Sequence, residues 1–337
     1  MIYNYTYKDL EEYFLSINEK KFRASQIFEW LYKKRVKDFS LMSNLKKDLI
    51  EHLEENFKIT DLELVDKQVS KDGTVKYLFE LEDKNTIETV LMRYEWGNSL
   101  CITTQVGCNM RCSFCASGLT GKYRDLETSE IILQVMKVEE LENIRISNIV
   151  IMGIGEPFDN YDNTMKAINL LNHPKSLEIG ARHITVSTSG VVPKIYDFMD
   201  ENLQINLAIS LHAPTNEVRN KIMRVNKAYD IDELIKACKD YVSKTNRRIT
   251  FEYILLRGIN DSDAHANRLS NLIRGINAYV NLIPYNEVDE FEFKRTDKAQ
   301  ALRFYDILKK RGINVTLRQE KGMDIFAACG QLRSKNM

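Results

Sequence analysis

The feature that most constrains the fold is an alternation of apolar runs and helical stretches after residue 100. Such alternation predicts parallel strands joined by right-handed crossovers. Six main units are too few for a closed eight-fold barrel, so we expect an α/β fold, a partial (β/α)6 barrel. The expected strands are Leu100–Gln105, Ser147–Gly153, His183–Ser189, Ile205–Leu211, Ile249–Leu256 and Tyr279–Tyr285, with a last run at Asn314–Gln319.

The first hundred residues have a different pattern. Apolar residues recur at three- and four-residue spacing in Lys8–Ile17, Ala24–Val36 and Asn44–Phe57, which predicts helices. Val75–Glu82 and Ile87–Tyr94 favour strands instead. We expect a helical accessory domain over 1–70, a strand extension over 71–98, the barrel over 99–320 and a C-terminal loop over 321–337.

Composition limits the class of protein. Hydrophobic residues make up 44% and charged residues 28%, as in ordinary globular proteins. No apolar run approaches the roughly twenty residues of a membrane span, and the N-terminus lacks the profile of a secretion signal. We therefore expect a cytoplasmic protein without a membrane partner. The net charge is zero, so any polyanion site must be a local basic patch.

Polar residues follow the expected strands at their carboxyl ends. Gly153–Pro157 follow the second strand, Ser187–Ser189 end the third, Ser210–His212 end the fourth, and Asn286 ends the sixth. Each alone is compatible with a simple turn or cap. Together they predict a site at the rim where α/β barrels carry their chemistry.

Four of the six cysteines lie between Cys101 and Cys115, and Cys108, Cys112 and Cys115 are spaced C-x3-C-x2-C. In a reducing compartment such clusters indicate metal binding or catalysis. Three thiolates on a four-iron cube leave one iron open, and S-adenosylmethionine can bind that iron through its amino and carboxylate groups. One electron then yields a 5′-deoxyadenosyl radical. The alternative is a zinc clip completed by Cys101.

The loop "CNMRCSFC" resembles the cluster loop of the radical S-adenosylmethionine (SAM) superfamily. Further motifs, "ETVLMRY", "SLCITTQVGC", "MGIGEPFDNYDN", "HITVSTSGVVP", "AISLHAP", "NLIPYN" and "DIFAACGQLR", resemble the RlmN/Cfr family of RNA adenine methyltransferases. The resemblance runs from about Arg23 to Arg333. Pro157, which follows Gly155 and Glu156, resembles the residue at this position in the C2-methylating branch. The C8-methylating antibiotic-resistance branch usually carries alanine there. Phe326 departs from the acidic or amide residue that is usual at its position.

The resemblance implies a role for each matching residue. Cys329 would accept a methyl group from one SAM, Cys101 would be its partner thiol in a disulfide, and Glu88 would be the general base. The implied SAM contacts are Gly155, Glu156, Ser187, Ser210, Leu211, His212 and Asn286. The implied cofactors are one 4Fe–4S cluster, held by Cys108, Cys112 and Cys115, and SAM as methyl donor and radical source.

The same resemblance implies the substrate and partners. The family methylates C2 of one adenosine in the peptidyl-transferase centre of 23S rRNA, which we expect to occur before ribosome assembly is complete. In some members the substrate includes a tRNA adenosine. A flavodoxin- or ferredoxin-type protein would donate the electron.

The chemistry agrees with a cysteine-bound methyl group. Carbon C2 of adenine is electron-poor and cannot attack SAM directly. A Cys329 thiolate can take the methyl. After radical addition to C2, attack by Cys101 on the Cys329 sulfur would release the RNA and leave a disulfide.

Other classes of protein stay open at this point: a C8 methyltransferase, another radical enzyme, and a zinc-bearing RNA-binding protein. A reactive cysteine far along the chain argues against a generic radical enzyme, which does not need one.

A basic run follows the apolar aromatic segment near residue 30. Its members, Lys33, Lys34, Arg35 and Lys37, either form a solvated face or contact RNA together with Lys20, Lys21 and Arg23. Cys238 is expected to be a buried apolar residue. Arg247 and Arg248 precede a strand and are expected at the surface, away from the site.

Overall fold

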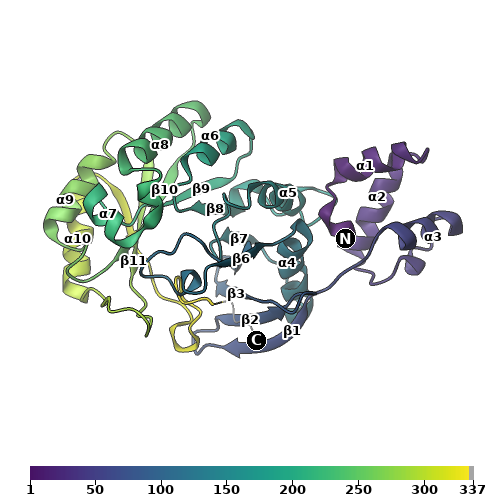
Figure 1. Ribbon diagram of the computed structural model, residues 1–337, viewed down its shortest axis with the longest axis horizontal. Coiled ribbons are helices and arrows are strands. Elements are labelled where there is room, and N and C mark those ends of the chain that lie inside the picture. The colour runs from purple at the N-terminus through teal and green to yellow at the C-terminus, as the bar shows by residue number, and fades with distance from the viewer. Residues whose placement is uncertain (334–337) are drawn as a thin grey trace.

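The computed structural model describes residues 1–333; residues 334–337, which end the expected C-terminal loop, lie outside the described part. A ten-stranded sheet organises the chain, in the order β1-β2-β3-β4-β7-β8-β9-β10-β11-β12 (Figure 1). The pairs from β1 to β4 are antiparallel, and every pair from β4 to β12 is parallel. The expected series of parallel strands is therefore confirmed.

The parallel strands are β4 (Gly97–Cys101), β7 (Asn148–Ile151), β8 (Ile184–Thr188), β9 (Asn206–Ser210), β10 (Ile249–Leu255), β11 (Ala278–Pro284) and β12 (Asn314–Leu317). Helices follow between them and cover the outer face of the sheet (Figure 1): α4 (Thr128–Glu142), α5 (Tyr161–Asn172), α6 (Val192–Asp200), α7 (Asn216–Ile222), α8 (Ile231–Thr245), α9 (Asp263–Leu272) and α10 (Lys298–Lys310). No helix among the described residues is long and apolar enough to cross a membrane.

The antiparallel part consists of β1 (Glu63–Val69), β2 (Val75–Glu80) and β3 (Thr86–Tyr94). Strands β2 and β3 were expected, whereas β1 was not. The division of the chain at residue 70 stays a prediction; β1 lies before it and yet pairs with β2. A separate hairpin of β5 (Gln105–Gly107) and β6 (Lys122–Asp125) was also not expected, and it frames the cysteine loop.

The N-terminal helices lie at the opposite end of the molecule from α6–α10 (Figure 1). They are α1 (Tyr7–Ser16), α2 (Phe22–Phe28), which continues into a π-helical turn at Glu29–Lys33, and α3 (Lys47–Asn56). Their expected helical character is confirmed. A short 3-10 turn before α1, Ile2–Asn4, contacts α4, where the Ser129 amide donates to Asn4 Oδ1 over 2.8 Å.

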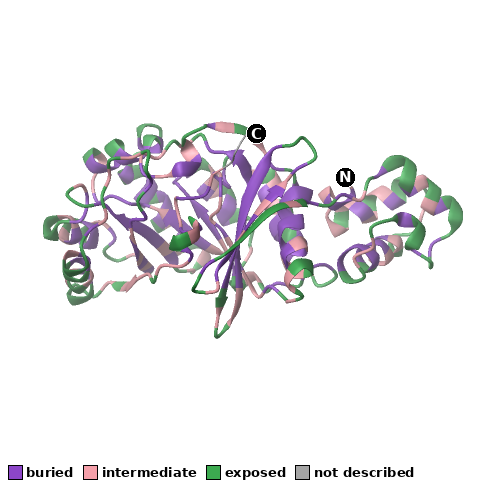
Figure 2. Ribbon diagram, turned by 90° about the horizontal axis from the view of Figure 1, so that it is seen from below, coloured by how far each residue is buried: buried purple, intermediate pink, exposed green. Residues whose placement is uncertain are grey.

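The two faces of the parallel sheet differ in character. Apolar side chains on one face, such as Ile149, Val186 and Leu207, are buried against the helices and form the main core. Figure 2 shows that most of the sheet consists of buried residues. Their neighbours in sequence, such as Asn148 and Thr185, point to the other face and stay partly exposed. The inner face is therefore not filled like the interior of a closed barrel.

Candidate functional site

Cys108, Cys112 and Cys115 line one cavity, here called the cluster cavity, at the carboxyl ends of the strands. Main-chain hydrogen bonds hold their loop. The Cys108 amide donates to the Gly121 carbonyl over 3.1 Å, and the Ser113 amide donates to the carbonyl of Ile222, at the end of α7, over 2.9 Å. The loop is thus tied both to the small hairpin and to a barrel helix.

The opposite wall of the cluster cavity carries most of the expected SAM contacts: Gly155, Glu156, Ser187, Ser210 and His212. The space inside the cavity measures about 160 Å³ and is partly open to solvent. Ser187 Oγ and Ser210 Oγ lie 3.3 Å apart, on neighbouring strands. The fold brings these five residues together around one cavity. Their contact with SAM stays a prediction.

Close packing determines the backbone conformation of Gly155, and main-chain hydrogen bonds hold the side chain of Glu156. Gly155 has a φ of +110°, and a Cβ there would lie 2.7 Å from Cβ of Gln105, so only glycine fits. The buried Glu156 carboxylate accepts from the amides of Phe158 (3.1 Å) and Ser189 (2.7 Å). Burial nevertheless raises the pKa of Glu156 above its usual range. Glu156 therefore fixes the loops that form the cavity wall.

His212 is buried, and its Nδ1 accepts a hydrogen bond of 3.1 Å from the Ile254 amide. Burial, followed by the charge of Arg219, lowers the pKa of His212 to about 3. The ring is therefore neutral at physiological pH, and its edge meets the Phe114 ring at a centroid distance of 5.1 Å.

Two of the expected SAM contacts are placed differently. The Leu211 side chain packs in the apolar core and does not line the cluster cavity, which leaves only its main chain for a ligand. Asn286 lines a neighbouring cavity. There its Nδ2 donates to the Cys329 carbonyl over 3.4 Å, and its Oδ1 is buried without a partner among the described residues.

The donor set fits an iron–sulfur cluster. Burial raises the pKa of Cys108 to about 12, and burial also raises the pKa values of the Cys112 and Cys115 thiols. A bound cationic centre would hold such thiols deprotonated. Within residues 1–333 no three His, Cys, Asp or Glu side chains converge closely enough for a single metal ion. Three thiolates are the ligand set of a four-iron cube with one open iron, whereas a structural zinc site needs a fourth protein ligand.

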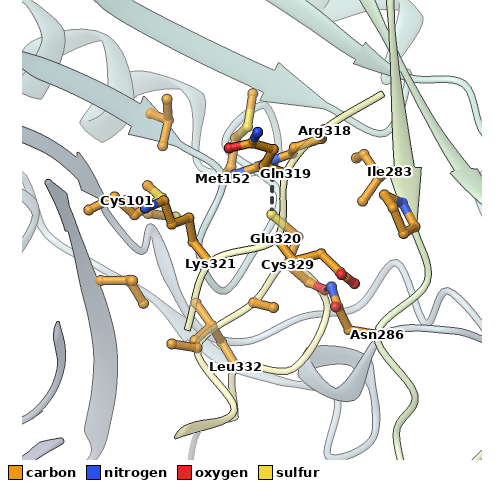
Figure 3. Close-up of a pocket in the computed structure, with 16 residues that line it drawn as sticks. Cys101, Met152, Ile283, Asn286, Arg318, Gln319, Glu320, Lys321, Cys329 and Leu332 are labelled. Carbon is orange, nitrogen blue, oxygen red and sulfur yellow. Dashed lines mark hydrogen bonds between the residues drawn. The ribbon is translucent and has the colours of Figure 1, made fainter. Parts of the chain in front are cut away.

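Cys101 and Cys329 line the neighbouring cavity, here called the thiol cavity (Figure 3). They come from β4 and from the C-terminal loop, and both are free thiols in the structure. Burial raises the pKa of Cys101 to about 12. The placement of Cys101 separates it from the three-cysteine loop, which is a further argument against the zinc clip.

Cys329 belongs to both cavities, as do Arg318, Met152 and Ile283. Arg318 Nη1 donates to Cys329 Sγ over 3.1 Å (Figure 3). The charge of Cys329, and then that of the buried Glu252, hold the pKa of Arg318 above its usual range. A sulfur at this position can exchange groups with ligands on either side of it.

The C-terminal loop is fixed to the rest of the fold at several points. The Gly322 amide donates to Asp72 Oδ2 over 3.0 Å, and the Ala116 amide donates to the Gly330 carbonyl over 2.8 Å. Phe326 adopts a left-handed conformation with a φ of +52° and is exposed. Asn and Asp tolerate this conformation better than aromatic residues do, which explains why an acidic or amide residue is usual there.

Glu88 is not brought into the thiol cavity. It shares the β3 face of Val90 and Met92, which do line that cavity, but its carboxylate lies in a separate pocket beside Arg333. Lys76 Nζ lies 3.0 Å from Glu88 Oε1, and the Arg333 amide donates to Oε2 over 2.7 Å. The C-terminal loop therefore covers the expected base.

The four cations of the basic N-terminal run all pair with carboxylates. Lys33 pairs with Glu178 at 2.8 Å, and Arg35 with Glu139 of α4. Lys34 pairs with Glu29 and lies over the Trp30 ring, while Lys37 pairs with Asp61 and Glu140. These ion pairs favour a solvated face, one of the two alternatives left open by the sequence, over a patch that contacts RNA. Cys238 is fully buried, as expected.

Two residues of the site were not predicted. Arg318 lies inside the last expected run, Asn314–Gln319, but the strand β12 ends at Leu317, so Arg318 is in fact the first residue after a strand. A correct strand end would have identified it as a rim residue. Arg219 of α7 is fully buried and donates to the carbonyls of Leu211 (3.1 Å), Ser210 (3.3 Å) and Ser189 and to Asn226. It ties together the ends of β8 and β9, and no local pattern reveals such a tertiary contact.

Comparison with known proteins identifies similar chains. A family model of the radical SAM superfamily matches residues 102–269, and one of the ribosomal RNA large subunit methyltransferase N-terminal domain matches residues 2–59. A probable dual-specificity RNA methyltransferase RlmN from Geobacillus kaustophilus is 57% identical, over 99% of this chain and 92% of its own. Its counterpart from Acholeplasma laidlawii is 52% identical over 100% of both chains.

A solved structure is similar over the same extent. The crystal structure of a radical SAM methyltransferase from Sphaerobacter thermophilus matches with a TM-score of 0.92 and 43% identity, over 98% of both chains. The expected radical-SAM partial barrel with N-terminal helices is confirmed by this match and by the family models.

Proposed function

Because the chain belongs to the RlmN family of radical SAM RNA methyltransferases, which use a 4Fe–4S cluster and SAM, we propose that it methylates C2 of an adenosine in 23S rRNA. The observation that carries the proposal is the position of Cys329 in the wall shared by the cluster cavity and the thiol cavity. A methyl-accepting thiol must meet SAM on one side and a base on the other.

Cys329 is the proposed methyl acceptor. Its sulfur attacks the methyl carbon of one SAM and S-adenosylhomocysteine leaves. A cluster bound by Cys108, Cys112 and Cys115 would supply the electron that generates a 5′-deoxyadenosyl radical from a second SAM. Gly155, Glu156, Ser187, Ser210 and His212 shape the space for that molecule.

The proposed second stage uses the remaining residues. The methyl on Cys329 loses a hydrogen atom and its carbon adds to C2 of adenine. Glu88 then removes the C2 proton, which requires the C-terminal loop to release the carboxylate from the Arg333 amide and Lys76. Cys101 gives up its proton and attacks the Cys329 sulfur, the carbon–sulfur bond breaks, and the released carbon takes up a proton to complete the methyl group on the RNA. The one electron left over by disulfide formation would return to the cluster, and the disulfide is reduced between turnovers.

Pro157 supports C2 rather than C8 as the methylated carbon, since the C2 branch of the family carries proline after its Gly-Glu pair. The C8 branch is the second candidate function. The proposed partners are 23S rRNA before assembly is complete, a tRNA adenosine as a second substrate, and a flavodoxin- or ferredoxin-type donor, all in the cytoplasm.

The test is mass mapping of methyladenosine isomers in ribosomal and transfer RNA after anaerobic incubation with the reconstituted protein, SAM and a reductant. We expect 2-methyladenosine in 23S rRNA. A product dominated by 8-methyladenosine would move the protein to the other branch, and unmethylated RNA beside active SAM cleavage would reject an RNA substrate.

A further inference from the structure

The inner face of the partial barrel is polar from its N-terminal end up to the thiol cavity. Along β7, Asn148, Val150 and Met152 share this face, and the last two line the thiol cavity. Two residues of strand span about 7 Å, so Asn148 lies one side-chain layer below the cavity that holds Cys329. The N-terminal mouth of the barrel therefore lies close to the reacting sulfur.

The mouth is lined by polar and aromatic side chains. By the same alternation its members are Asn148, His183, Asn206, Arg248 and Tyr279, each at the start of a strand or just before it. Asn148 Oδ1 lies 2.8 Å from His183 Nδ1, and the Arg248 guanidinium lies 5.2 Å from the centroid of the Tyr279 ring. All five side chains carry a polar group, whereas the packed interior of a closed barrel is filled mainly by apolar side chains.

An exposed aromatic pair borders the mouth at the β3–β4 turn. The Tyr94 and Trp96 rings stack at a centroid distance of 4.5 Å with planes 9° apart, and Trp96 is 64% exposed. The next residue, Gly97, approaches Ser147 and Asn148 so closely that a Cβ would lie 2.3 Å from Ser147 Oγ. Lys321, which lines the thiol cavity, has its Nζ 5.5 Å from the Tyr94 ring centroid.

The cations around the mouth differ from those of the N-terminal helices. Arg182 bonds to Gln204, Arg247 bonds to Asn206, and Arg248 and Lys321 lie against aromatic rings. None of these four forms an ion pair with a carboxylate within residues 1–333. Since the chain has no net charge, a group of positive side chains without acidic partners is a local site for a polyanion.

A second polar hollow continues this surface. It lies at the N-terminal ends of β11 and β12 and is lined by Asn277 and Asn314 together with Arg274 and Arg311. Both arginines hydrogen-bond to Asn271 Oδ1, an uncharged acceptor. Their charge is therefore also available to an anionic ligand.

We propose that single-stranded RNA docks on the N-terminal mouth of the barrel. Trp96, backed by Tyr94, stacks on a base that flanks the target, and Arg182, Arg248 and Lys321 contact phosphates. The target base passes between Asn148 and Tyr94 into the thiol cavity. Stacking on an aromatic ring beside a cationic track is how proteins hold single strands without reading their sequence. This inference rests on the proposed RNA methyltransferase function and assigns the surface that serves it.

The test compares Trp96→Ala, Trp96→Phe and Arg248→Gln with Arg268→Gln, a control at an exposed arginine on the outer helix α9. The probe is a labelled RNA hairpin with an unpaired adenosine in its loop, titrated into the reconstituted protein at several salt concentrations. SAM cleavage without RNA is measured in parallel and should match the wild type in all four variants.

Trp96→Ala should weaken RNA binding about tenfold, whereas Trp96→Phe should keep most of the wild-type affinity because the phenyl ring can still stack on a base. Arg248→Gln should reduce the slope of log affinity against log salt by about 0.7, the value for one phosphate contact on a single strand. The chain has only two tryptophans, and Trp30 lies among the N-terminal helices. RNA should therefore quench the protein's fluorescence in the wild type and not in Trp96→Phe.

Wild-type affinity and salt dependence in both Trp96→Ala and Arg248→Gln, with RNA still methylated by the wild type, would overturn the docking surface and leave the proposed function intact. Normal RNA binding combined with slower reduction by the electron donor would assign the surface to that protein instead. A wild type that neither binds nor methylates RNA would reject the proposed function itself.

Discussion

The guanidinium of Arg318 donates a hydrogen bond of 3.1 Å to the sulfur of Cys329, at the point where the two cavities meet. A cation beside the sulfur stabilises its charged, nucleophilic form. The methylated sulfur carries no negative charge and accepts hydrogen bonds only weakly. The contact is therefore strongest before methyl transfer.

Arg318→Met should slow methyl transfer to Cys329 by roughly ten- to a hundredfold, the equivalent of a hydrogen bond to a charged group. Peptide mass spectrometry of the Cys329 segment after incubation with SAM measures the methylated fraction. Arg318→Lys keeps the positive charge and should slow methyl transfer less than Arg318→Met does. Equal rates in wild type and Arg318→Met would show that the contact has no part in the transfer.

Cys112→Ala should abolish iron incorporation and SAM cleavage, because each of the three loop cysteines is proposed to supply one of only three protein ligands. Iron content and 5′-deoxyadenosine production measure the loss. Cys238→Ala is the control, since Cys238 is a buried cysteine on α8 that lies outside the lining of either cavity. Retention of a full cluster in Cys112→Ala would contradict the ligand assignment.

Cys101→Ala should trap the protein on RNA. In the proposed mechanism, methyl transfer and radical addition do not use the Cys101 thiol, whereas release of the product does. A denaturation-resistant protein–RNA species on a gel is the expected result, and Cys329→Ala should give none. Normal turnover by Cys101→Ala without any trapped species would leave Cys101 as a strand residue with no part in release.

Acid should loosen the C-terminal loop before the barrel unfolds. Desolvation alone would raise the pKa of Asp72, but hydrogen bonds to Thr74, Gly322 and Ser70 outweigh it and lower the pKa to about 2. A carboxyl group whose pKa is lowered in the folded state stabilises it above the unfolded value near 4, and this contribution disappears as the pH falls towards 2. Limited proteolysis between pH 5 and pH 2 should cut the loop earlier than the barrel.

Asp72→Asn should show the same loosening already at neutral pH, because an amide cannot carry the charge that the Gly322 amide faces. Cleavage of the barrel should stay at the wild-type rate. A loop equally resistant in both proteins at every pH would show that Asp72 does not hold it.

Phe326→Asn should stabilise the protein. Residue 326 has a left-handed backbone, which costs an ordinary L-residue about 1 kcal/mol and asparagine less. The side chain is 53% exposed, so little buried apolar contact is lost. Thermal unfolding should show a small rise in Tm for Phe326→Asn, whereas Phe326→Ala should not. A fall in Tm would mean that the ring makes a contact worth more than the backbone strain.

The sequence predicted the parallel strands because their apolar runs are buried on the helix side along nearly their whole length. Strand β1 was missed because six of its seven residues are exposed, so it shows no apolar alternation. The β5–β6 hairpin is short and interrupted by Gly107, whose φ is +75°. Its existence follows from tertiary contacts rather than from propensity.

Polar residues at the carboxyl ends of the expected strands identified most of the candidate site. Their positions in the sequence could not show which of the two cavities each residue lines. Asn286 and Ser210 both end strands, yet they face different spaces. The basic run that includes Arg35 shows that the sequence also could not predict which cations form ion pairs. Arg35 and Glu139 are 104 positions apart, and only the folded chain shows that the cation is already paired.

The polar inner face has a consequence for how such a protein can change over generations. The apolar packing that holds the sheet together lies between its outer face and the helices, so side chains on the inner face contribute little to stability. Substitutions at Thr185 or Thr250 can therefore alter what the barrel admits without endangering the fold. A scaffold with this separation can drift towards new substrates by single replacements, each of them tolerable by itself.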